Sequence, residues 1–227
     1  QLGYAGQGTA DDIVDRAQAE IYEVTERRNS EDFKPLSDLV VVAADEISAL
    51  GNRREGLIGV PTGIERTFEP HEIIVSKTDP RGWMTYVNDV FVSVSGFTEA
   101  ELIGKPHSLI RHPQMPRCVF KLLWDTLKGG DEIFAYVVNR ARNGDHYWVF
   151  AHVTPTFDAQ HAIIGYHSNR RVPKRSAIAQ IEPIYAALSA EEARHMDRKL
   201  GLERSHQILL DTLAKKGVAY DEFVFSL

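Results

Sequence analysis

The sequence contains a single cysteine and no long apolar run. Cys118 alone cannot form an internal disulfide, which is typical of a protein in a reducing compartment. The longest apolar run, residues 39–44, is far shorter than the roughly 20 residues that a membrane-spanning helix needs. The first residues also lack the charged and then apolar pattern of a signal peptide. We therefore expect a cytoplasmic protein that is not inserted in a membrane.

Local signatures of common enzymes are also missing. The chain has no Gly-x-Ser-x-Gly motif, no paired carboxylate motif and no Gly-x-x-x-x-Gly-Lys-Ser/Thr phosphate loop. Hydrolase and kinase activities are therefore disfavoured, and we predict no enzymatic activity and no catalytic residues. The formal net charge of −6 argues against nucleic acid as the main partner.

Two helices are expected near the start of the chain. Apolar residues recur at helical spacing over residues 11–28 and again over residues 36–52. Two short amphipathic helices cannot bury both apolar stripes against each other, so this region should pack on another part of the protein or on another copy. Four glycines and Pro61 make residues 51–63 a linker.

From residue 69 the pattern changes to alternating strands and short helices. Asn88 and Thr98 are typical helix caps, and Glu101 completes a capping box after Thr98. An apolar stripe predicts a helix over residues 119–127. β-rich runs and turn signals predict strands over residues 72–76, 82–87, 134–140, 146–157 and 163–171. This order predicts an α+β fold, in which an antiparallel sheet carries its helices on one face.

Two more helices are predicted after the last strand, over residues 178–188 and 202–215. With 227 residues, of which 43% are hydrophobic, the chain can bury the core of one large or two small domains. We expect a helical region over residues 1–63, a mixed α+β domain over residues 64–175 and a helical extension over residues 176–227.

The loop before the helix at residues 119–127 carries the densest group of hydrogen-bond donors. Three prolines disfavour regular secondary structure over residues 104–116. The same loop contains His107, Arg111 and His112. A mere connector does not need this many donors, so we predict a binding role; a solvated surface loop is the alternative.

The N-terminal region resembles a known family. Residues 12–22, 35–39 and 59–63 are similar to the linker of DnaB-type replicative helicases, just ahead of their ATPase domain. The phosphate loop of that family is missing, so helicase activity is not expected. What the resemblance implies is the role of the linker, a helix that docks on a neighbouring subunit, and hence a homo-oligomer. A fusion of the two regions is the alternative.

The middle of the chain resembles the PAS sensor fold. The resemblance rests on residues 86–91, 95–106, 143–148 and 164–166. Residues 107–116 and 139–144 are similar to a narrower group, the FAD-binding PAS domains of bacterial aerotaxis receptors. The likeness covers residues 69 to about 175, and the last eight residues resemble the end of stand-alone relatives. It implies a five-stranded antiparallel sheet and a bound FAD.

The resemblance also implies which residues bind FAD. Asn88, Arg111 and His112 match positions needed for FAD binding in that family, and His107 should help to shape the pocket. Arginine suits the pyrophosphate because its planar fork makes paired, charge-assisted hydrogen bonds. Asn88 has another possible role, since an asparagine after a strand often caps the next helix. Gln114 departs from the family, which usually has an acid there.

Two residues on the predicted strands complete the candidate site. Asn139 and Trp148 lie on neighbouring strands and are expected to face the flavin ring. Packing in the core is the alternative for Trp148. Light sensing through a cysteine–flavin adduct is disfavoured, because His107 occupies the position of the reactive cysteine. Cys118 is instead expected as a small buried residue inside the following helix.

Taken together, these features predict a redox or oxygen sensor that relays the state of FAD to a signalling protein partner. A ligand-free PAS module for dimerisation or docking is one alternative. A haem-binding PAS sensor is another, because the chain has nine histidines, among them two pairs six residues apart. No carboxylate or cysteine accompanies these histidines at ligand spacing, so no metal site is predicted.

Overall fold

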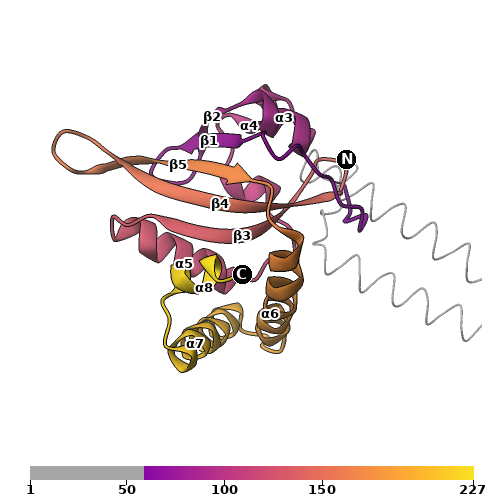
Figure 1. The fold of residues 1–227 in the computed structure, drawn as a ribbon. Coiled ribbons are helices and arrows are strands. Elements are labelled where there is room, and N and C mark those ends of the chain that lie inside the picture. The colour runs from indigo at the N-terminus through magenta and orange to yellow at the C-terminus, as the bar shows by residue number, and fades with distance from the viewer. Residues whose placement is uncertain (1–58) are drawn as a thin grey trace, which may run out of the picture. The chain divides into compact units, whose positions relative to one another are not determined.

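The computed structural model describes residues 59–227. The helices expected over residues 11–28 and 36–52 lie outside the described residues, as does nearly all of the helicase-like region. The described part forms an antiparallel sheet with helices packed on it and a set of C-terminal helices (Figure 1). This is the α+β fold that the sequence predicts.

The sheet has five strands. In chain order they are β1 (Ile74–Thr78), β2 (Met84–Val87), β3 (Ile133–Arg140), β4 (His146–Phe157) and β5 (Ile163–Arg171). Their order in the sheet is β2-β1-β5-β4-β3, with every neighbouring pair antiparallel. The last three strands match their predicted bounds to within one residue, because the Asn143-Gly144 turn fixes the β3–β4 hairpin. β1 begins two residues later than predicted.

Short helices follow β2 and lead to one longer helix. They are α3 (Asp89–Ser95), α4 (Glu99–Leu102), the 3₁₀ helix η1 (His107–Ile110) and α5 (Arg117–Lys128). The predicted caps are confirmed: Asn88 caps α3, and Thr98 and Glu101 form a capping box on α4. The prediction that residues 104–116 lack secondary structure is wrong for η1. Its turn starts right after Pro106, where the missing N–H of a proline breaks no helical hydrogen bond.

The C-terminal helices are α6 (Arg175–Ala193), α7 (Arg198–Lys216) and α8 (Tyr220–Phe225). Of these, α6 and α8 pack on the face of β3 and β4 that lies opposite α5, and α7 packs on α5 and α6. The hydroxyl of Tyr185 in α6 donates to the Tyr136 carbonyl at 2.8 Å, and Phe225 in α8 packs on Phe134 of β3. Both α6 and α7 are longer than predicted, because their ends are polar and carry no apolar periodicity. The sheet is therefore covered on both faces at β3, whereas outward side chains at the β1–β2 end, such as Lys77 and Tyr86, are exposed.

Residues 59–66 are bound to the β3–β4 turn. The Gly59 N–H donates to the Arg142 carbonyl at 2.7 Å, and the Asp145 carboxylate accepts from Thr62 at 2.6 Å and from Arg66 at 3.0 Å. Hydrogen bonds from Thr62, Asn143 and Arg66 lower the pKa of Asp145 to about 2. The end of the predicted linker is thus held against the domain by backbone hydrogen bonds and by the Asp145 carboxylate.

Candidate ligand-binding site

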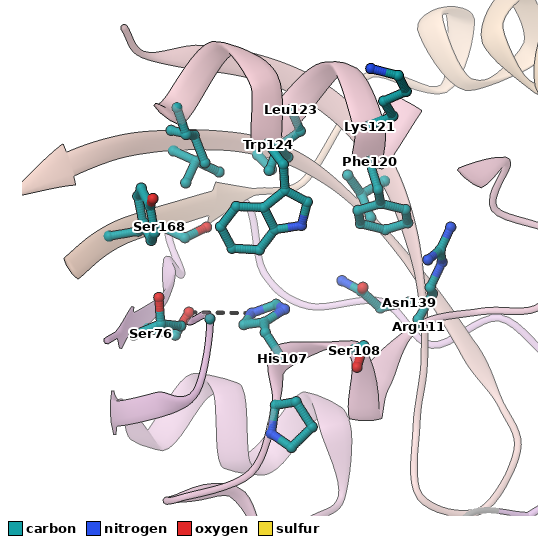
Figure 2. Close-up of a pocket in the computed structure, with 18 of the residues that line it drawn as sticks. Ser76, His107, Ser108, Arg111, Phe120, Lys121, Leu123, Trp124, Asn139 and Ser168 are labelled. Carbon is teal, nitrogen blue, oxygen red and sulfur yellow. Dashed lines mark hydrogen bonds between the residues drawn. The ribbon is translucent and has the colours of Figure 1, made fainter. Parts of the chain in front are cut away.

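A cavity of about 460 Å³ lies between the sheet, α5 and η1 (Figure 2). Its floor comes from side chains that alternate along β3, β4 and β5 and so share one face of the sheet. Its roof comes from one side of α5, where Phe120, Leu123 and Trp124 point inward. The volume falls in the range of roughly 300–1,000 Å³ that is usual for small-molecule sites.

Three of the predicted site residues line this cavity: His107, Arg111 and Asn139. The backbones of Arg111 and Asn139 pair in an isolated antiparallel bridge, which brings the loop to β3. The Arg111 guanidinium lies 4.0 Å from the centre of the Phe120 ring. Its Nη2 atom is buried and has no hydrogen-bond partner among residues 59–227. Figure 2 shows Arg111 and Asn139 side by side at one end of the cavity.

His107 lies deeper in the cavity, beside β1. Its Nε2 atom is 3.4 Å from the Ser76 hydroxyl. Burial, followed by repulsion from the Arg170 charge, lowers the pKa of His107 to about 3. The imidazole is therefore neutral at physiological pH and can accept a hydrogen bond on one ring nitrogen.

Three predicted residues do not line the cavity: Asn88, Trp148 and His112. The Asn88 Oδ1 atom accepts from the N–H groups of Phe91 at 3.1 Å and Val75 at 2.9 Å, and its Nδ2 donates to the Ile73 carbonyl at 2.8 Å. Its side chain ties α3 to β1, which agrees with the capping role. Trp148 pairs with Val138, the residue next to Asn139 in β3. Since successive side chains of a strand alternate between faces, Trp148 points to the face of the sheet opposite the cavity. There it stacks on Tyr185 with ring centres 6.3 Å apart.

His112 faces a second depression that adjoins the first. This depression has a volume of about 560 Å³, and Arg111 lines both. Burial, followed by the neighbouring His146 and Arg140, lowers the pKa of His112 to about 4. The second depression is basic. Three arginines line it, Arg111, Arg117 and Arg198, with Glu192 as its one acid, and His112 and His195 also line it.

Arg170 is a site residue that the sequence analysis missed. Its side chain lines the cavity, although the residue is only 2% exposed. Its Nη2 donates to the Ser76 hydroxyl and its Nε to the Ser168 hydroxyl at 3.1 Å, while Nη1 has no partner among residues 59–227. Its neighbours across the sheet, Ile74 and Ala151, are apolar. No periodic pattern distinguishes such a buried arginine from an exposed one.

Trp124 is the second missed residue. Its ring lines the cavity and meets Tyr166 edge-on, with centres 5.3 Å apart. A signal was available, because Phe120 and Trp124 are four residues apart and thus on one side of the predicted helix.

Cys118 is buried in the first turn of α5, as predicted, and is not part of the cavity wall. Burial raises the pKa of its thiol to about 11. Within residues 59–227, no three His, Cys, Asp or Glu side chains gather around a point where a metal ion would bind. No helix in that range is long and apolar enough to cross a membrane.

A match to a known protein family agrees with this fold. Residues 84–169 match the sequence model of the PAS fold. These residues form a PAS domain. The match ends at Asn169, inside β5, and it includes His107, Arg111 and Trp124.

Comparison with known proteins finds similarity to an aerotaxis receptor and to a nitrogen fixation regulatory protein. The chain is 45% identical over 117 residues to the aerotaxis receptor of Escherichia coli, which covers 52% of this chain and 23% of the receptor. It is 29% identical over 103 residues to a nitrogen fixation regulatory protein of Klebsiella pneumoniae, which covers 45% of this chain and 21% of the regulator. A solved light-oxygen-voltage domain overlays 49% of this chain and 84% of its own, at 16% identity and a TM-score of 0.43.

A separate match concerns the replicative helicase DnaB of Leifsonia xyli. The chain is 48% identical to it over 69 residues, which covers 30% of this chain and 15% of the helicase. The chain thus spans less than a quarter of the length of each of these three curated relatives. The resemblances to an aerotaxis receptor and to a DnaB helicase, both predicted from motifs, are confirmed.

Proposed function

We propose that the protein is a cytoplasmic PAS sensor that binds FAD and relays its redox state to a protein partner. The observation that carries the proposal is the pair of joined depressions on either side of Arg111. One is lined mainly by apolar side chains and the other is basic. FAD has the same division, because a flat, largely apolar ring system is joined to a pyrophosphate and a second nucleotide.

The inner cavity suits the ring system. Trp124 and Phe120 offer flat apolar surfaces on the α5 side, as Figure 2 shows. Asn139 is 3% exposed and brings one amide with both a donor and an acceptor. Arg170 brings a buried N–H with no partner among residues 59–227. An isoalloxazine ring has carbonyl oxygens, ring nitrogens and one N–H along one edge, which these groups complement.

The basic depression suits the pyrophosphate. The Arg111 Nη2 atom has no partner among residues 59–227. Arg198, the first residue of α7, and His195, in the loop between α6 and α7, line the same depression. A charge-assisted hydrogen bond to phosphate contributes about 1.5–3 kcal/mol. A mononucleotide would leave most of this second depression unused, which favours FAD over FMN.

α5 offers a route from the cavity to a partner. Phe120 and Trp124 contact the cavity, while Arg117 in the same helix binds Glu192 of α6. A shift of the ring on reduction would therefore act, through its packing on Phe120 and Trp124, on a helix that also holds the C-terminal helices. The partner would be a signalling protein. Self-association remains a prediction from the helicase-like region.

The test is an absorbance spectrum of freshly purified full-length protein, before and after dithionite. We expect a flavin band that bleaches on reduction, with the released cofactor identified as FAD by chromatography. Arg111→Ala should weaken FAD binding by roughly ten- to a hundredfold, since it removes one or two charge-assisted bonds. The matched control is Arg204→Ala, which removes an exposed arginine on α7.

Other outcomes would redirect the proposal. A colourless protein that takes up no added FAD would overturn flavin binding and leave a PAS module for protein association. A haem-type band would transfer the cofactor role to the histidines. Equal loss of FAD in Arg111→Ala and Arg204→Ala would contradict the assignment of the basic depression.

A further inference from the structure

Arg170 is a buried charge without a counter-ion. The residue is 2% exposed, and residues 59–227 offer its side chain two serine hydroxyls and the face of the Phe91 ring, 4.7 Å from the guanidinium carbon. No carboxylate of the described chain forms an ion pair with it. Burial lowers the pKa of Arg170 to about 10, so the group remains charged at neutral pH. A buried cation is costly unless it is paired, and a ligand with negative charge would pair it.

The titratable groups around Arg170 are neutral. His107, from η1, has its pKa lowered to about 3 by burial and by Arg170. Tyr147, from β4, has its pKa raised by burial. A guanidinium only donates, so the Ser76 hydroxyl accepts from Arg170, and its own proton is free to bond the Nε2 of neutral His107. The inner end of the cavity therefore carries one uncompensated positive charge.

We propose that Arg170 binds the N1 and C2-carbonyl edge of the flavin ring and stabilises the negative charge that this edge acquires on reduction. This inference rests on the proposed function. Two electrons from an external donor, dithionite in the experiment below, and one proton from water convert the oxidised ring to a reduced ring. That ring carries the proton on N5 and one net negative charge shared by N1 and the C2 oxygen.

The layout of the cavity would bring the flavin ring to Arg170. Arg170 lies on β5 and Asn139 on β3, with β4 between them, so they approach the ring from two places on the floor. Arg111 lies beside Asn139, at the side that opens to the basic depression. A dinucleotide with its pyrophosphate near Arg111 would thus extend its ring toward the inner end, where Ser76, His107 and Arg170 lie.

The first test compares flavin reduction in three variants. Arg170→Met removes the charge and keeps most of the apolar stem, and Arg170→Lys keeps a charge. The control is Arg171→Met, which removes the next arginine of β5, an exposed residue on the other face. Each full-length variant is loaded with FAD and titrated with dithionite against reference dyes. The readout is the midpoint potential, with melting curves as a check on folding.

We expect Arg170→Met to lower the equilibrium constant for two-electron reduction by about tenfold or more, which is a fall of about 30 mV or more. Arg170→Lys should lie between Arg170→Met and the unchanged protein. Arg171→Met should match the unchanged protein. An Arg170→Met potential equal to that of Arg171→Met would overturn the role of Arg170 while leaving FAD binding intact. Failure of the unchanged protein to bind FAD would overturn both proposals.

A second measurement needs no variant and covers the case in which Arg170→Met fails to fold. The midpoint potential of the unchanged protein is followed from about pH 5 to about pH 8, where uptake of one proton with two electrons gives about 30 mV per pH unit. We expect this slope over the whole range, because Arg170 keeps N1 unprotonated. A slope near 59 mV per pH unit at the acid end means that two protons are taken up, and it would overturn the inference.

Discussion

Arg117 and Glu192 form an ion pair of 2.8 Å that joins the start of α5 to the end of α6. The same carboxylate accepts from the Cys118 N–H at 2.9 Å and from the Ser205 hydroxyl of α7 at 3.0 Å. Burial acts to raise the pKa of Glu192, but the hydrogen bonds from Arg117, Cys118 and Ser205 outweigh it and leave the pKa lowered. One largely buried carboxylate thus holds three helices together.

Glu192→Gln should lower the free energy of unfolding by about 1–3 kcal/mol, because it replaces a charged acceptor of three hydrogen bonds. The expected loss is smaller than for a fully buried ion pair, because 24% of the Arg117 side chain is exposed and water weakens its attraction to Glu192. Urea unfolding followed by circular dichroism measures the change. Glu182→Gln, an exposed position on α6, is the control. Equal free energies of unfolding for the two variants would contradict the proposal that Glu192 joins the three helices.

Asp145 should make stability depend on pH in the acid range. Its pKa is about 2 in the folded protein and about 3.9 in an unfolded chain, so its charged form favours folding. This contribution to stability is complete above the pKa of Asp145 in the unfolded chain. It is lost as the pH falls through the pKa of Asp145 in the folded protein. Asp145→Asn should therefore melt at a lower temperature than the unchanged protein near neutral pH, and the difference should shrink toward about pH 2. A difference that stays constant with pH would contradict this assignment.

Gly144→Ala should detach the segment at residues 59–66. Gly144 has a φ of 96°, and an added Cβ would collide with the backbone of Val60. Gly63 has a φ of 76° but open space around it, so Gly63→Ala tests the backbone conformation alone. We expect a loss of about 1 kcal/mol for Gly63→Ala and a clearly larger loss for Gly144→Ala. Limited proteolysis before residue 66 should increase only in Gly144→Ala.

Substitutions of Trp124 and Trp148 should have different effects, the first on FAD binding and the second on stability. Trp124→Ala removes a wall of the cavity and should weaken FAD binding by roughly three- to tenfold. Trp148→Ala removes a side chain from the opposite face and should lower the free energy of unfolding by about 3–5 kcal/mol, with FAD affinity preserved while the protein is folded. Fluorescence titration with FAD and urea unfolding give the two readouts. The reverse pattern would contradict the placement of the two rings.

The sequence predicted the strands well where local chemistry determines them. Asn143-Gly144 sets a tight hairpin, so the bounds of β3 and β4 follow from it. The capping box at Thr98 is equally local. By contrast, the ends of α6 and α7 depend on tertiary contacts such as that of Glu192 with Arg117, which join residues 75 positions apart and leave no periodic signal.

The candidate site was only partly predictable, for a related reason. His107, Arg111 and Asn139 come from motifs, and all three line the cavity. Trp148 was expected to face the flavin ring. The hairpin register instead pairs Tyr147 with Asn139, so Trp148 lies on the face of the sheet opposite the cavity. Arg170 was missed because its partners, two serines and a phenylalanine face, are distributed over β1, β5 and α3.

The burial of Cys118 makes the protein convenient for site-specific labelling. It is the one cysteine of the sequence, its side chain is enclosed, and its thiol has a pKa of about 11, so thiol reagents should react with it slowly. A cysteine introduced at Met196, which is fully exposed between α6 and α7, would then take a spin or fluorescent probe selectively. Spectra of such a probe under air and under reducing conditions would record whether the C-terminal helices move.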